Sequence, residues 1–274
     1  MRIAHNLSAM NTQRQMSMNA ALLVVSTEKM SSGIKINRSG DDPAGFSICE
    51  KMRGQIRGLD MASRNTQDGI SMIQTAEGSL SEVHEILQRM RELAVQAAND
   101  TNVAADRSAL DEEFKQLSNE ITRISSNTDF NTQILLDGSI SGVKLQVGSS
   151  SGQIITVSLS VTGVSLSSVT ASIATMNLTN QSDASAAITG INTQILAVAA
   201  GRSYLGAWQN HFQHTVKDIE NSSENLQSAE SRIRDVDMAK EVMILSKSNL
   251  LHQAGQAMLA QANQAPQGVL QLLR

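Results

Sequence analysis

Two histidines are the first residues of this sequence whose type and spacing could support metal chemistry. His211 and His214 lie three positions apart, so they would share one face of a helix. A zinc site needs three or four ligands, and neither a third ligand nor an HExxH pattern accompanies this pair. We therefore interpret both histidines as surface side chains and expect no metal site.

The other candidates for chemistry are an acidic pair and a single thiol. Asp41 and Asp42 could attract a cation, but Asp42 directly before Pro43 is typical of a helix N-cap. Cys49 is the single cysteine, so the chain forms no intrachain disulfide, and a small buried residue is favoured over a reactive thiol. The sequence thus predicts no catalytic residue, no cofactor and no enzymatic activity.

The composition favours a thin helical protein. Aromatic residues make up only 2% of the chain, whereas the seams of helical bundles accept Ala, Ser and Met. The net charge of −4 gives no basic surface, which argues against a nucleic-acid partner. The opening MRIAHNLSAM has no signal-peptide core, and no later apolar run has membrane length. We expect no membrane partner, and a chain that is cytoplasmic or exported without a cleaved signal peptide.

The longest pattern in the chain is a seven-residue repeat of apolar residues. It is unbroken through Ile191, Val198, Leu205, Phe212, Ile219, Leu226 and Ile233. Such a repeat forms a stripe along a helix that is stable only against partner helices. It predicts a helix over about 184–234, roughly 70 Å long at 1.5 Å per residue.

Two further helices have stripes that could pack on this one. The helix at about 56–98 has two adjacent heptad series, Ile73, Leu80, Leu87 and Ala94 beside Ala76, Val83, Met90 and Ala97. A third helix at about 103–128 has Leu110, Phe114, Leu117, Ile121 and Ile124 on one face. A short helix should run from Pro43 to about Arg53, where Gly54 and Gly58 weaken it. The sequence predicts an antiparallel bundle.

The middle of the chain changes from a period of seven to a period of two. Val143, Leu145 and Val147 alternate with polar residues, and a Gly/Ser turn precedes a second alternating run. This pattern predicts a β-hairpin at about 140–160. The Ser/Thr-rich remainder to 183 is expected to be a loop or a short strand, and residues 162–180 a replaceable external segment.

The two ends of the chain are weaker amphipathic helices. Residues 1–31 carry Met10, Leu22 and Val25 at helical spacings, and residues 237–274 carry Met243, Leu250 and Leu251. We expect the two helices to pair with each other, and neighbouring copies of the chain to order so thin a unit.

The expected fold is therefore mainly α: an elongated antiparallel helical bundle or coiled-coil rod with a small β-hairpin, plus a paired N- and C-terminal helix domain. The expected domains are 1–40 with 235–274, and a rod over 41–234.

Long ordered motifs at both ends resemble a known family, bacterial flagellin. The resemblance covers roughly 1–138 and 184–274. The motifs are SSGI at 31–34, INR at 36–38, GDD at 40–42, EKMRGQIRG at 50–58, IQTAEG at 73–78, AESRIRDVDMA at 229–239 and QAMLAQAN at 256–263. Only about 139–183 remain between them, so the chain resembles a short form without large outer domains.

The resemblance implies a function that the helical pattern alone does not. It implies a structural subunit that self-assembles into the extracellular bacterial flagellar filament for swimming motility. The partners it implies are further copies of the chain, a flagellar export chaperone, the type III export apparatus, and the filament cap and hook–filament junction proteins. A hook–filament junction protein, or a cytosolic coiled-coil scaffold, is the alternative.

One segment of the resemblance carries a further implication. Residues 88–93, QRMREL, resemble the flagellin segment read by the host Toll-like receptor that senses flagellin. The match implies that Arg89 and Leu93 contact the receptor, with Glu113 of the following helix in support. These residues could equally bind the next subunit.

Overall fold

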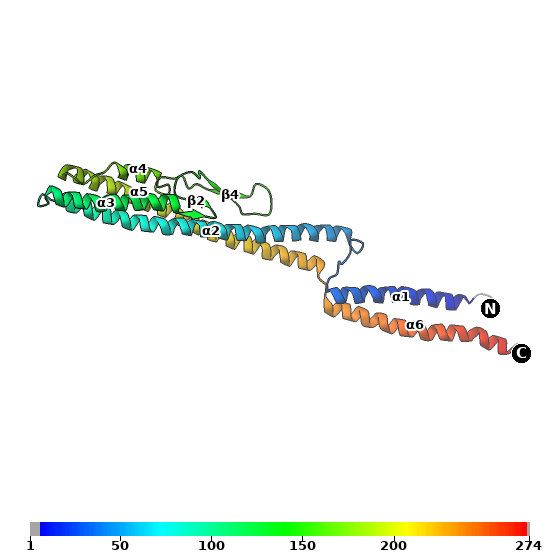
Figure 1. Ribbon diagram of the computed structural model, residues 1–274. Coiled ribbons are helices and arrows are strands. Elements are labelled where there is room, and N and C mark those ends of the chain that lie inside the picture. Colours follow the sequence, from blue (N-terminus) through cyan, green and yellow to red (C-terminus); the bar gives the residue numbers. More distant parts are fainter. Residues whose placement is uncertain (1–5, 273–274) are drawn as a thin grey trace. The chain divides into compact units, whose positions relative to one another are not determined.

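The computed structural model describes residues 6–272, and helices dominate this range (Figure 1). The helices are α1 (Leu7–Ser32), α2 (Pro43–Ala97), α3 (Ala104–Asn127), α4 (Ser167–Ala174), α5 (Gln181–Arg234) and α6 (Met238–Leu272). The strands are β1 (Asp129–Phe130), β2 (Gln133–Ile134), β3 (Val143–Gln146) and β4 (Ile154–Val157). The prediction of a mainly helical chain with long paired helices and a small β-hairpin is confirmed.

The chain divides into two compact units, which we describe separately. The central unit spans Gln55–Glu224, and the terminal unit combines the residues up to Gly54 with those from Asn225 onward. Helices α2 and α5 contribute residues to both.

The core of the central unit lies between α2, α3 and α5. Both heptad series of α2 are buried there, together with Phe114 and Ile121 of α3 and the apolar stripe of α5. Gly69 allows close contact, since a Cβ there would lie 3.3 Å from the Phe212 ring and 2.6 Å from Leu145 Cδ1. Large side chains fill this seam, so the core is built from the residues that the repeat predicted.

Helix α2 is continuous, and the predicted interruption after Arg53 is wrong. Gly54 and Gly58 lie within the helix. At Gly58 a Cβ would come 2.7 Å from the Cβ of Ser149, so this glycine admits the turn of the second hairpin. A glycine in a long helix costs only about 1 kcal/mol relative to alanine, which packing along the helix offsets.

Two hairpins lie in the central unit. The predicted one is confirmed: β3 pairs antiparallel with β4, with Val143 opposite Val157 and Gln146 opposite Ile154. The sequence did not predict β1 and β2, whose two-residue turn places Asn131 and Thr132 at φ of 51° and 67°. Positive φ at both turn positions matches the right-handed twist of the strands.

The segment after the second hairpin is part of the core, so the expectation of a loop or short strand is wrong. It contains α4, whose Val169 and Ile173 are buried. Gly163 packs directly on α5, since a Cβ there would overlap the carbonyl oxygen of Ala197. The Leu178 N–H donates to Oδ1 of the buried Asp111 on α3, at 2.8 Å.

In the terminal unit α1 and α6 pair antiparallel. At one end the Asn6 side chain donates to the Ala262 carbonyl at 2.8 Å. At the other, Ile34 and Asp235 form an antiparallel bridge, and the Val236 N–H donates to the Gly33 carbonyl at 3.1 Å. Gly33 ends α1 in a left-handed conformation, which glycine adopts without steric cost.

The loop between α1 and α2 is held by carboxylates. Asp41 Oδ2 accepts from the N–H groups of Asn37 and Arg38 at 3.0 Å, and these bonds lower the Asp41 pKa. Asp42 Oδ1 accepts from the Gly45 N–H at 3.0 Å. The predicted N-cap is therefore confirmed, with Pro43 as the first residue of α2.

Candidate functional site

The side chains that could have done chemistry have structural roles. His211 and His214 are exposed on α5, and the His211 ring packs edge-on against Trp208, with ring centroids 5.4 Å apart. Within residues 6–272, no three His, Cys, Asp or Glu side chains gather as metal ligands would. Of the acidic pair, Asp41 accepts a backbone hydrogen bond within the loop before α2, and Asp42 caps the first turn of α2.

Cys49 lies in the terminal unit, where it is only 3% exposed. Burial raises the pKa of its thiol, and the nearby Glu230 carboxylate acts in the same direction. Because the thiolate is the reactive form, both effects make this cysteine inert.

The predicted seam residues of the long helices lie at the core. Seven of the eight are buried, namely Leu80, Leu87, Ile191, Val198, Leu205, Phe212 and Ile219. Leu226 is half-buried and lies in the terminal unit, beyond the end of the central core.

The seam between α1 and α6 mixes small and polar residues with a few half-buried apolar ones. On α1 the covered positions recur at heptad spacing: Ala9, Thr12, Met16, Asn19, Leu23, Ser26 and Met30. On α6 they are Glu241, Leu245, Ser248, His252, Gly255, Leu259 and Ala262. Ser26 and Ser248 are buried, and the backbones approach until Cα atoms of the two helices lie within 8 Å. Small side chains permit this close approach.

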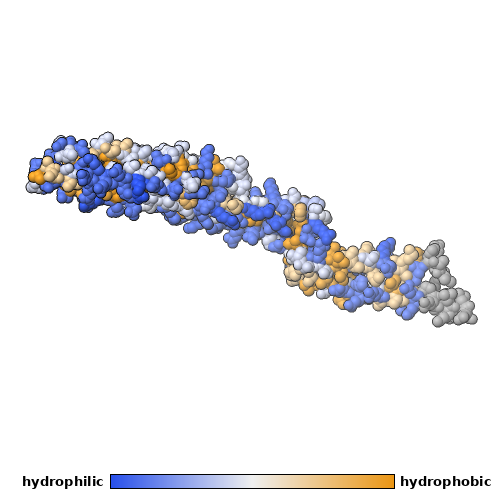
Figure 2. Space-filling view, in the orientation of Figure 1, coloured by the Kyte–Doolittle hydropathy of each residue, from blue (hydrophilic) through white to orange (hydrophobic). Residues whose placement is uncertain are grey.

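Most large apolar residues of α1 and α6 lie outside the seam. We call them the outer faces: Met10, Met18, Leu22, Val24 and Val25 on α1, and Met238, Val242, Met243, Ile244, Leu250, Leu251 and Met258 on α6. All are exposed, and Leu250 and Met10 retain 67% and 63% of their accessible surface. Apolar colour accordingly covers much of the visible surface of the terminal helices (Figure 2).

In the single chain the predicted residues Met10, Leu22, Val25, Met243, Leu250 and Leu251 therefore remain accessible to neighbouring copies. The registers of Met243 with Leu250, and of Leu251 with Met258, lie on the outer face of α6. The helices pair through the opposite side, where Ser26, Ser248 and Gly255 lie beside the half-buried Leu23 and Leu259. The sequence did not predict this seam, because its heptad positions hold a mixture of small, polar and apolar residues.

A charged cluster joins α2 to α3 on the central unit. Arg89 donates to Glu113 Oε1 through Nη2 at 2.9 Å and Nε at 3.1 Å, and through Nη1 to Glu92 Oε2 at 3.1 Å. These hydrogen bonds, that of Glu113 first, raise the pKa of the Arg89 guanidinium. All three side chains are exposed. The three hydrogen bonds therefore hold the guanidinium of Arg89 in one orientation at the surface.

Leu93 does not share this surface. Its side chain is 1% exposed and belongs to the same core cluster as Phe114 of α3. The expectation of a direct receptor contact through this side chain is therefore corrected. The third helix widens the buried face of α2 beyond the two heptad series, and this brings Leu93 inside.

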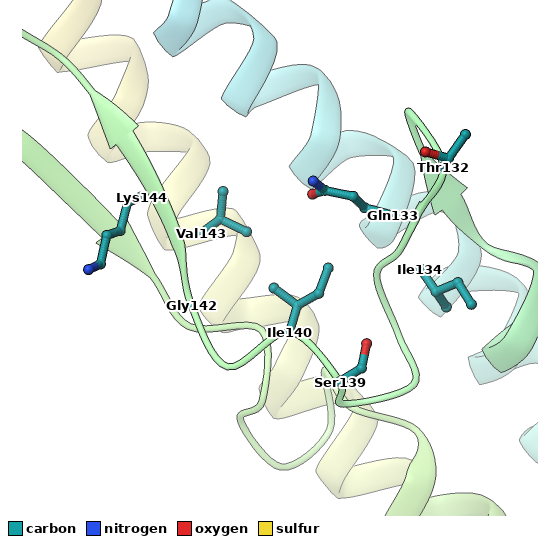
Figure 3. Close-up of a pocket in the computed structure, with 8 residues that line it drawn as sticks. All are labelled: Thr132, Gln133, Ile134, Ser139, Ile140, Gly142, Val143 and Lys144. Atoms are coloured by element: carbon teal, nitrogen blue, oxygen red, sulfur yellow. The ribbon is translucent and has the colours of Figure 1, made fainter.

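A shallow groove lies beside the hairpins, with a volume of about 670 Å³. Figure 3 shows its lining residues: Thr132, Gln133, Ile134, Ser139, Ile140, Gly142, Val143 and Lys144. Lys144 is their only charged side chain, and it lies across the group from Thr132 and Ile134 (Figure 3). The lining offers no pairing of nucleophile and base.

Part of α5 is apolar enough, by length and composition, to cross a membrane. The window has a mean hydropathy of 1.2 and is one-third buried. Ile191, Ile195 and Val198 of this helix contribute to the core cluster. Packing within the central unit therefore accounts for the buried third of this window.

Comparison with known proteins identifies the family. The family model for the bacterial flagellin N-terminal helical region matches residues 3–141, and that for the C-terminal helical region matches 188–273. The flagellin of Halalkalibacterium halodurans is 60% identical over 272 residues, covering 99% of each chain. The chain belongs to the bacterial flagellin family.

Further flagellins agree with this assignment along the chain. The flagellin of Bacillus subtilis is 46% identical and covers both chains fully. The crystal structure of Bacillus cereus flagellin is 32% identical, with a TM-score of 0.51 over 61% of this chain and 94% of that one. A putative flagellar hook-associated protein from Vibrio parahaemolyticus has a TM-score of 0.59, covering 71% and 100% of the two chains. At 14% identity it shows only a shared fold.

As a flagellin, the chain is a structural subunit of the extracellular flagellar filament and not an enzyme. Flagellin self-assembles into that filament, which serves motility. Residues 142–187, between the two matched regions, hold only the second hairpin, α4 and the first turns of α5. They form a short middle segment, consistent with a minimal outer part.

Proposed function

We propose that the outer faces of α1 and α6 are the polymerisation surfaces of this flagellin. The observation that carries the proposal is that Met10, Leu22, Val25, Met243, Leu250 and Leu251 are all exposed in the single chain. In this assignment residues 1–40 with 235–274 form the filament core domain, and 41–234 form the rod outside it.

The arrangement of the two faces supports an open assembly. Each face lies on the side of its helix away from the shared seam, so α1 and α6 offer separate apolar surfaces. A single self-complementary patch would favour a closed dimer, whereas two different patches lead to rings or continuing helical polymers. Each copy can therefore contact one neighbour through α1 and another through α6.

Burial of these faces supplies the driving force for assembly. Covering one large aliphatic side chain contributes about 1.5–3 kcal/mol, so a few such contacts offset the cost of association. The same burial orders α1 and α6, whose own seam buries few large side chains.

The test compares two exposed positions of α6. Leu250→Gln should raise the critical concentration for polymerisation at least tenfold, because it replaces an apolar contact by an amide. Gln253→Ala, less than one turn away, should change it by less than twofold. Sedimentation of purified protein over a concentration series measures both. Equal critical concentrations for Leu250→Gln and the unmodified chain would remove this face from the interface.

The same exposed surfaces support the further partners proposed for the chain. Before assembly, apolar helices require cover, which a flagellar export chaperone would provide until the type III export apparatus takes the chain. Filament cap and hook–filament junction proteins would meet the terminal helices at the two ends of the polymer. Weaker chaperone binding by Leu250→Gln, measured by calorimetry, tests the first of these partners; unchanged affinity would exclude this face.

We also propose that the cluster of Arg89, Glu92 and Glu113 is recognised by the host Toll-like receptor that senses flagellin. Its support is the fixed, exposed guanidinium on a segment that resembles the receptor-read motif. Leu93 supports the surface from below by packing α2 on α3.

Two arginines of α2 provide the matched test of receptor recognition. Arg89→Ala should reduce signalling by the monomer at least tenfold in a reporter cell line, because it removes the oriented charge. Arg91→Ala removes a charge from an exposed position two residues along, and should have less than a threefold effect. Equal signalling by both variants, with unchanged circular dichroism, would exclude the cluster.

A further inference from the structure

Methionine is distributed unevenly between the two units. Five methionines of α1 and α6 are 46–66% exposed, namely Met10, Met18, Met238, Met243 and Met258. In the central unit Met72 and Met90 are 4% and 0% exposed, and Met61 is exposed at 52%. Accessible thioethers are thus concentrated on the terminal helices.

These thioethers lie among the apolar side chains of the outer faces. Met243 precedes Leu250 by one heptad, Met258 follows Leu251 by one heptad, and Met18 lies one turn before Leu22. Met10 also lines a groove of about 610 Å³ between the helices with Leu259. Methionine is flexible and fills irregular contacts well, but unlike leucine it can be oxidised.

We propose that Met10, Met18, Met243 and Met258 form a redox-sensitive modification site that controls assembly. Hydrogen peroxide oxidises their thioethers in the unassembled subunit, and the modified subunit polymerises poorly. The proposal rests on the role of the outer faces as polymerisation surfaces.

The chemistry needs peroxide and an accessible sulfur. The sulfur lone pair attacks one peroxide oxygen, the O–O bond breaks, and a new S–O bond forms. The second oxygen leaves as water with both peroxide hydrogens, so sulfur loses the two electrons that peroxide gains. Methionine sulfoxide reductases reverse the change.

The sulfoxide is harmful at an interface because it is polar. Its oxygen accepts hydrogen bonds, and the apolar side chains that would cover it offer no donor. Burying one unsatisfied acceptor costs a factor of about ten in an equilibrium constant. Oxidation at several of the four positions therefore opposes polymerisation strongly.

Assembly should in turn protect the same residues. A sulfur covered by a neighbouring copy is closed to peroxide, so oxidation acts on free subunits rather than on finished filaments. Met61 lies on the central unit, outside the outer faces, and therefore serves as the reference methionine.

The experiment treats the monomer with hydrogen peroxide, maps sulfoxides by mass spectrometry and measures the critical concentration by sedimentation. Each variant is compared with its own untreated sample. Oxidation should raise the critical concentration of the unmodified chain and of Met61→Leu at least tenfold. It should change that of a variant with leucine at Met10, Met18, Met243 and Met258, and also at Met238, by less than twofold. Methionine sulfoxide reductase should restore the untreated value.

Two results would overturn the proposal: unchanged polymerisation of the oxidised chain, or equal sensitivity of the leucine variant. An unchanged critical concentration of untreated Leu250→Gln would instead contradict the proposed polymerisation surfaces. A second measurement compares oxidation rates in monomer and filament. Met243 and Met258 should react at least tenfold more slowly in the filament, and equal rates would also overturn the proposal.

Discussion

The central unit and the terminal unit use the same heptad spacing with opposite contents. In the central unit the repeat places Leu80, Leu87 and Phe212 inside, where none of them retains accessible surface. In the terminal unit it places Ser26 and Ser248 inside, Leu23 and Leu259 are only half-buried, and most large apolar residues remain outside. Heptad spacing thus tells which helices can pair, and the size of the seam residues tells whether the pair is stable by itself.

The difference separates a self-sufficient unit from a conditional one. The central core removes large side chains from water, which is the main stabilising term in folding. The pair of α1 and α6 gains close backbone packing but little apolar burial, so its helices open more easily.

The largest effect should come from residues 164–178. Replacing them with a Gly/Ser linker of equal length removes five buried side chains, Val164, Leu166, Val169, Ile173 and Leu178. At about 1.5–3 kcal/mol each, their loss matches the whole stability of a domain, about 5–15 kcal/mol. The central unit should lose its cooperative thermal transition, measured by circular dichroism.

A control in the second hairpin sharpens this result. Replacing Ser150 and Ser151 in the exposed turn by glycine should keep the transition, because both side chains face solvent. An unchanged melting temperature after the linker replacement would mean that residues 164–178 are dispensable, as the sequence suggested.

A paired truncation compares the two units directly. Phe212→Ala should lower the free energy of unfolding by about 3–5 kcal/mol, because it leaves a cavity beside Gly69. Leu250→Ala in the monomer should change it by less than about 0.5 kcal/mol, because that side chain already faces water. Urea unfolding of both variants measures the difference. Similar values would show that the two helix pairs are equally self-sufficient.

The smallest effect lies in the first hairpin of the central unit. Thr132 is β-branched and adopts φ of 67°, a conformation that glycine tolerates better. Thr132→Gly should raise the free energy of unfolding by about 0.5–1 kcal/mol, while Asn131→Gly should gain less because asparagine tolerates φ of 51°. Thermal unfolding compares them, and a loss of stability in Thr132→Gly would show that its side chain supports the turn.

The sequence predicted the elements whose pattern comes from large side chains. The stripe from Ile191 to Ile219 is unbroken, and burying it against α2 leaves little choice of register. The alternating run around Val143 and Val157 specified the second hairpin in the same way.

The errors arose where tertiary contacts outweigh local preference. Helix α4 is short and rich in serine, so its two buried residues gave no clear period. Gly58 suggested a break in the helix, whereas in the structure its missing side chain leaves room for Ser149 of the second hairpin's turn. The seam of α1 with α6 was missed because hydrophobicity favoured the larger residues, and Leu93 was placed outside because the width of the three-helix core was unknown.

Amide hydrogen exchange of the monomer and the filament measures whether the pair of α1 and α6 depends on neighbouring copies for its stability. In the monomer, backbone amides of α1 and α6 should exchange rapidly while those of Ile73–Leu87 and Ile191–Phe212 stay protected. In the filament both sets should be protected, because neighbouring copies cover the outer faces. Protection of α1 and α6 in the monomer equal to that of the central core would contradict the account.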